Sequence, residues 1–164
     1  MIEGLEEFLV QIDDLSKIEQ DVFRIVDECG AHVVGEARNR IAPDTGDLRK
    51  SINHTTEIQN EEISSTIHTN SDHAAFVEFG TGPVGAANHA GTAPDVAVAY
   101  SPDKWFGKIP ELAGTQGEKD KGFRYIAGQP AKPYLYPALK DNEEQLTEKI
   151  KADLKEILEG KTNG

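Results

Sequence analysis

One triplet in the sequence has the residues of a catalytic motif. Asp44-Thr45-Gly46 matches the active-site triplet of aspartic proteases, in which two carboxylates share one proton. The triplet occurs once, so a second carboxylate would have to come from another copy in a homodimer. The preceding segment has a helical pattern and the next residue is the charged Asp47, whereas protease triplets lie on loops between apolar strands. We therefore favour a simple turn, and keep a small dimeric aspartyl peptidase using Asp44 as the alternative hypothesis.

A glycine pattern further along suggests a second kind of chemistry. Gly80-Thr81-Gly82-Pro83-Val84-Gly85 matches GxGxxG, which in dinucleotide-binding proteins joins a strand to a helix whose N-terminus faces the pyrophosphate. The residues that follow, 86–95, contain Gly91 and Pro94 and have no helical pattern. We interpret the glycines as a flexible turn and predict no cofactor.

The histidines and the cysteine have no recognised ligand spacing. His68 and His73 lie near Asp72 and Glu78, but no HExxH or Cys/His pattern accompanies them, so we predict no metal site. Cys29 is the single cysteine, which excludes an internal disulfide. It lies on the apolar face of a predicted helix, where we expect a small core residue.

The charge balance limits the kinds of partner. The 164 residues include 17 Lys and Arg against 29 Asp and Glu, a formal net charge of −12. Because phosphate binding needs a surplus of basic residues, this argues against a grip on DNA or anionic lipid, but not against a wall past which DNA slides. Residues 1–30 hold nine acids and two bases, more than half of the excess. No apolar run is long enough to span a bilayer, and acids stand where a signal peptide needs bases, so we expect a protein made and folded in cytoplasm.

Apolar residues at three- and four-residue steps predict helices at both ends of the chain. One is expected up to Leu15, and a second from the capping box of Ser16 and Glu19 up to Pro43. The last helix is expected from about residue 134 or 138 to residue 159. A single ordinary domain, or a domain with a long embellishment, fits the chain length.

Shorter elements are expected between these helices. Residues 47–52 add a short turn of helix, and residues 53–59 and 63–69 form a hairpin around Asn60-Glu61-Glu62. Residues 74–79 are a short, strand-like apolar segment that ends at Gly80.

The stretch from Gly80 to Gly128 has a different composition. It contains nine of the fifteen glycines and four of the eight prolines, together with several aromatic residues, and shows no sustained period. Two interpretations stay open: a surface loop packed on its own domain, or an arm that orders against a neighbouring subunit. Trp105-Phe106, with Lys104 and Lys108, has the composition to stack a nucleic-acid base, but we favour an aromatic anchor in a protein–protein interface.

Three stretches together point to a known family. They are APDTGDLRKSI at residues 42–52, HAAFVEFGTG at 73–82 and GQPAKPYLYPALKDN at 128–142. In this order, after a helical N-terminus, they resemble the phage tail-component family typified by the gene-10-like product of HK-97-type phages, whose members are tail-completion or neck proteins. With its flanking helices the resemblance covers most of the chain outside residues 83–125.

The resemblance implies a non-enzymatic structural protein with an α+β fold. N-terminal helices and a C-terminal helix would pack on a small, mostly antiparallel sheet, in a single domain over residues 1–164 with an extended loop or arm at about 83–125. The structural or interaction positions that we select are Pro43, Asp44, Thr45, Gly46, Leu48, Phe76, Glu78, Gly80, Thr81, Gly82, Trp105, Phe106, Pro130, Pro133 and Leu135. Turn geometry and packing account for the family-like ones among them, and none requires a catalytic role.

The resemblance also implies partners and a location. The protein would assemble with itself as a ring, most simply a hexamer, and contact the tail tube and the head-connector or neck proteins. Phage DNA would pass through without specific binding, and no membrane would be involved. The protein would reside in the tail or neck of the virion, and in the host cytoplasm during assembly.

Overall fold

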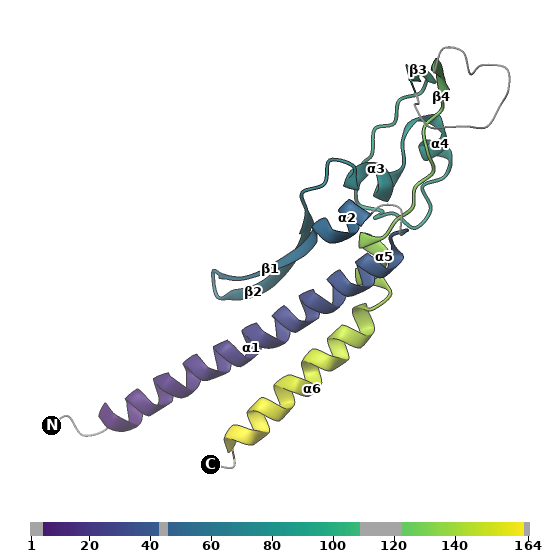
Figure 1. Cartoon of the computed structure of the whole chain (residues 1–164). Coiled ribbons are helices and arrows are strands. Elements are labelled where there is room, and N and C mark those ends of the chain that lie inside the picture. The colour runs from purple at the N-terminus through teal and green to yellow at the C-terminus, as the bar shows by residue number, and fades with distance from the viewer. Residues whose placement is uncertain (1–4, 43–45, 109–122, 163–164) are drawn as a thin grey trace. The chain divides into compact units, whose positions relative to one another are not determined.

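The computed structural model describes residues 5–42, 46–108 and 123–162, which form two compact units (Figure 1). Unit 1 comprises Met1–Asn70 and Ala138–Gly164, and unit 2 comprises Ser71–Pro137. Unit 2 is therefore inserted into the chain of unit 1. Within the described ranges, no helix is long and apolar enough to cross a membrane.

Unit 1 is organised around one long helix, α1 (Leu5–Arg40). We expected a break at Ser16, but α1 continues through it. The reason is that Ile12, Leu15, Ile18 and Val22 follow one another at three- and four-residue steps, so the apolar stripe keeps its phase and no cap is needed. Pro43, which we expected to end the helix, lies outside the described residues.

A short helix and a hairpin follow α1. Helix α2 (Gly46–Ser51) leads into β1 (Ile52–Gln59), which pairs antiparallel with β2 (Glu62–Thr69). The predicted hairpin is thus confirmed. Its two turn residues, Asn60 and Glu61, have φ of 52° and 66°, the left-handed values of a two-residue turn that matches the twist of the strands.

The core of unit 1 lies where α1 meets the hairpin and the C-terminal helices. The described apolar side chains buried there include Ile25, Val33, Val34, Ala37, Ile41, Leu48, Ile52, Ala138 and Leu146. Cys29 is also buried, as predicted for a small core residue, and burial raises the pKa of its thiol. The α+β class is confirmed: the long N-terminal helix packs on a two-stranded antiparallel sheet and on the C-terminal helix.

The predicted last helix is two helices, α5 (Leu135–Lys140) and α6 (Glu143–Thr162). The interruption falls at Asp141 and Asn142. The Asn142 side-chain amide donates to the backbone carbonyl of Ala138. The backbone carbonyl of Asn142 accepts from the Leu146 N–H at 2.9 Å, the first hydrogen bond of α6. Asp141 forms an ion pair with Arg40 of α1 at 2.7 Å.

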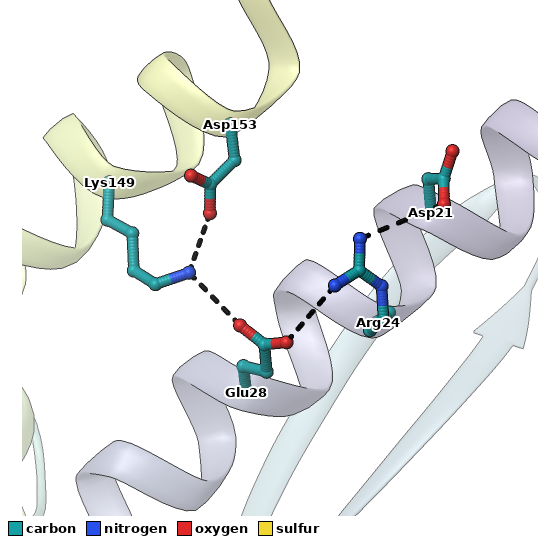
Figure 2. Close-up of polar contacts among 5 residues, drawn as sticks. All are labelled: Asp21, Arg24, Glu28, Lys149 and Asp153. Carbon is teal, nitrogen blue, oxygen red and sulfur yellow. Dashed lines mark hydrogen bonds and ion pairs between the residues drawn. The ribbon is translucent and has the colours of Figure 1, made fainter. Parts of the chain in front are cut away.

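Ion pairs connect α6 to α1 along their exposed side (Figure 2). Lys149 of α6 lies between Glu28 of α1, at 3.2 Å, and Asp153, at 2.6 Å. Arg24 in turn contacts Glu28 at 3.5 Å and Asp21 at 3.8 Å. Asp153 and then Glu28 raise the pKa of Lys149 by hydrogen bonding, but the partners are substantially exposed, so the pairs orient the helices more than they stabilise them.

A polar network joins α1 to the hairpin. Asp27 Oδ1 accepts from Thr56 Oγ1 at 2.8 Å and lies 3.0 Å from His54 Nε2. The Thr56 hydroxyl is also 3.1 Å from Ser65 Oγ. Hydrogen bonding by Thr56, and then by His54, lowers the pKa of the Asp27 carboxyl.

The hairpin approaches α1 most closely at Gly30. A Cβ atom there would meet the Ser65 hydroxyl and would lie 2.8 Å from the His54 ring, whereas a Cβ on Gly35, five residues on, would meet nothing within 4 Å. Gly30 therefore serves close packing, and Gly35 does not.

Substituting these two glycines tests the packing of the hairpin on α1. We expect Gly30→Ala to lower the free energy of unfolding by about 1–2 kcal/mol, because the hairpin must shift. Gly35→Ala, the matched control in the same helix, should raise it by about 0.5–1 kcal/mol through helix propensity. Urea unfolding followed by circular dichroism measures both, and equal effects of the two substitutions would contradict the packing described.

Asp27→Asn tests the polar network through its pH dependence. A carboxyl with a lowered pKa stabilises the fold above its unfolded value of about 3.9 and loses that effect as the pH falls through the folded value. We therefore expect the variant to melt below the wild type at pH 7, and the difference to shrink below about pH 4. The exposed Asp95→Asn serves as the control, and a difference in melting temperature that is independent of pH would contradict the assignment.

Candidate interaction surface

Unit 2 is built around a buried carboxylate. Glu78, 6% exposed, lies in α3 (Ala74–Phe79). Its Oε2 accepts from the backbone N–H groups of Tyr134 and Leu135 at 2.8 and 2.9 Å, and its Oε1 accepts from Tyr136 at 3.0 Å. Three charge-assisted bonds satisfy the buried charge and fix the entry to α5. Burial, and then the charge of Glu78, raise the pKa of Tyr134 to about 12.

Backbone hydrogen bonds also join residues 77–81, at the end of α3, to residues 129–132, which precede α5. Thr81 exchanges backbone hydrogen bonds with Gln129, at 2.9 and 3.2 Å, and the Lys132 N–H donates to Val77 O at 2.8 Å. A Cβ on Gly128 would collide with the Thr81 carbonyl, and one on Gly80 would lie 2.7 Å from the Gln129 carbonyl. Glycine is required at both positions because two backbones touch there.

We expected residues 74–79 to resemble a strand and residues 80–85 to be a flexible turn, and both are helical in part. Residues 74–79 form α3, and α4 (Gly82–Ala87) starts within the glycine pattern, with Pro83 in its first turn. The expected structureless loop also contains β3 (Trp105–Lys108), which pairs antiparallel with β4 (Phe123–Ile126). Long-range contacts to residues 127–136 hold α3 and α4, while β3 and β4 pair with each other. Local periodicity does not report such contacts.

A hollow of about 690 Å³ opens beside α3. We call it the aromatic hollow, and its larger apolar and aromatic side chains are Phe76, Val77, Phe79, Val98, Tyr100 and Trp105. The Tyr100 hydroxyl donates to Phe79 O at 2.7 Å and the Gln129 amide to Phe76 O at 2.9 Å, which fixes two of its walls. Its described lining contains no Asp, Glu, Lys or Arg.

The hairpin of β3 and β4 exposes aromatic rings on the face opposite the hollow. Trp105, 40% exposed, lines the hollow and lies against Gly82. Because successive side chains of a strand point to opposite faces, Phe106 and its cross-strand partner Tyr125 lie on the other face. Their ring centroids are 5.4 Å apart, and they are 62% and 72% exposed. We call these two residues the aromatic pair.

The structure brings most of the predicted positions together in unit 2. Glu78 contacts the backbone of Leu135, Gly80 and Thr81 touch Gln129, and Gly82 lies against Trp105, with Phe76 lining the hollow. Pro130 and Pro133 belong to the segment that joins β4 to α5. Gly46 and the buried Leu48 lie in α2 of unit 1. Pro43, Asp44 and Thr45 lie outside the described residues, so their roles stay predictions.

Catalytic arrangements find little support in the described ranges. The Val84 and Thr81 N–H groups of the GxGxxG pattern donate to the carbonyls of Ala127 and Gln129. These two donors are therefore already used within the protein and do not point to a phosphate. No group of three or more His, Cys, Asp or Glu is placed to hold a metal in the described part of the chain. Ser65 bonds to Thr56, while His54 bonds to Asp27, so the three groups are not linked in the order that a Ser-His-Asp site requires.

Comparison with known proteins supports the resemblance seen in the motifs. The sequence profile of the family described as "Bacteriophage HK97-gp10, putative tail-component" matches residues 6–80. Over these residues the chain is similar to the HK97-gp10-like tail components. The match includes α1, the β1–β2 hairpin and α3 with Glu78, a little under half of the sequence. No curated protein and no solved structure matches the chain.

The matched segment ends before most of the residues that complete unit 2. The third motif, at 128–142, and the hairpin of β3 and β4 lie outside it. A tail component is a structural part of a virion, which favours a non-enzymatic protein over a peptidase using Asp44.

Sequence reasoning missed four residues that shape this surface: Tyr100, Tyr125, Gln129 and Tyr134. Tyr100 and Tyr125 lie in a segment without a period, and Gln129 and Tyr134 owe their roles to contacts about 50 residues distant. The density of aromatic residues in the Gly-rich stretch was the available signal.

Glu78→Gln tests the carboxylate that organises unit 2. The glutamine amide has one acceptor oxygen and places an NH2 donor against backbone N–H groups. We therefore expect the substitution to lower the free energy of unfolding of unit 2 by about 2 kcal/mol. Trp105 is the single tryptophan and lies in unit 2, so its fluorescence during urea unfolding reports on this unit. The control is the exposed Glu57→Gln in β1, which should change little. Equal midpoints for Glu78→Gln and the wild type would contradict this role.

Proposed function

We propose that this tail component completes the phage tail and couples the tail tube to the head connector as a closed ring of identical copies, most simply a hexamer. The observation on which the proposal depends is the HK97-gp10-like match over α1, the hairpin and α3. We treat residues 1–164 as one tail-component domain, in which residues of the 83–125 stretch act as an arm toward a neighbouring copy. The exposed aromatic residues of β3 and β4 support that role, because such residues commonly anchor protein–protein contacts.

The distribution of charge supports a passive relation to DNA. Unit 1 contains 22 acidic and 11 basic residues, and unit 2 contains seven and six. A ring whose inner wall includes unit 1 would repel phosphate and let the genome pass without binding. The protein would be found in the virion tail or neck after assembly in the host cytoplasm.

Removing the gene from its phage tests the proposal. We expect filled heads and separate tails, with the infectious titre reduced by orders of magnitude, and restoration by the gene supplied in trans. Electron microscopy counts joined particles, and mass spectrometry of purified virions detects the protein. Normal joined virions without the protein would refute a role in completion or coupling.

A further inference from the structure

Unit 2 has a recess and a projection of similar chemistry. The recess is the aromatic hollow, and the projection is the aromatic pair. They lie on opposite faces of one hairpin, because Trp105 faces the hollow and Phe106, the next residue, faces away. A single copy therefore cannot place its own pair in its own hollow without dismantling β3 and β4.

Charge restricts where two copies can touch. Unit 1 has a net charge of −11 and unit 2 has a net charge of −1. Contacts between two copies of unit 1 would oppose like charges, which is costly at an interface, whereas contacts between copies of unit 2 avoid that cost. The described lining of the hollow is uncharged apart from the titratable His73, and so it suits an aromatic side chain rather than a charged segment.

We propose that the aromatic pair of one copy inserts into the aromatic hollow of a second copy. This inference rests on the proposed ring and names the surfaces that would form it. Because the two surfaces differ, the contact is heterologous: each copy offers one pair and one hollow, and successive copies can add until the ring closes.

The contact is expected to be modest between two isolated copies. Two aromatic side chains bury about 150–250 Å² each, which is small beside the area of a stable dimer. Closure of a ring makes the last contact intramolecular and so strengthens the whole assembly.

Mixing two defective variants tests the proposal directly. Phe106→Ser combined with Tyr125→Ser removes the pair but keeps the hollow. Ala99→Trp fills the hollow, which Ala99 lines from an exposed position, but keeps the pair. Sedimentation velocity over a wide concentration range should show oligomers for the wild type and monomers for each variant alone. An equimolar mixture should stop at dimers, because only one intact contact can form.

A matched control variant accompanies the mixture. Val96→Ser removes another exposed apolar side chain of unit 2, outside the hollow, and should associate like the wild type. Circular dichroism and Trp105 fluorescence verify that every variant is folded.

Several results would overturn the proposal. They are a wild type that stays monomeric at every concentration, a pair variant that associates normally, and mixtures that form either no dimers or full-size oligomers. Loss of association in the pair variant but not in the hollow variant would indicate two-fold stacking of the pairs instead. The gene-removal experiment tests the proposed function separately from this contact. If the contact is absent, the protein could still couple heads to tails through copies that meet at other surfaces. If coupling is absent, the contact could still form between copies.

Discussion

The buried carboxylate of Glu78 is the constraint on which unit 2 depends. Of the described apolar side chains that are buried, Tyr134 alone belongs to this unit, so the described part of unit 2 has little hydrophobic core. Glu78 compensates by binding three consecutive backbone N–H groups that are more than fifty residues away in sequence. That connection sets α3 against the segment before α5, and the glycines at 80 and 128 then let the two backbones touch. The hollow lies beside α3, so its shape follows from the same connection.

The two units divide the physical tasks of the protein. Unit 1 has the hydrophobic core, the long helix and nearly all of the charge excess. Unit 2 is close to neutral and presents aromatic rings to solvent. The acidic excess and the exposed aromatic rings are therefore assigned to different units of one chain.

Local patterning predicted unit 1 well and unit 2 poorly. Residues of α1, the hairpin and α6 follow regular apolar steps or strand alternation, so the type of each element could be predicted from neighbouring residues. The misses in unit 1 were the expected break at Ser16 and the interruption at Asp141 and Asn142. Residues 74–79 look like a strand because they are short and apolar, and only contacts with residues 127–136 make them helical. The pairing of β3 with β4 joins residues on either side of a stretch without periodicity, which no local rule detects. Motif resemblance singled out Glu78 and Gly80, and the geometry shows a carboxylate bonded to three backbone N–H groups and a glycine where two backbones touch.

The insertion of unit 2 has a mechanical consequence. Unit 2 is attached to unit 1 by two covalent connections, one after β2 and one leading into α6, and both of these elements pack on α1. A pull on unit 2 is therefore shared by two chain segments and transmitted to a single long helix. Because the load divides between the two connections, breaking either one alone would leave unit 2 attached through the other.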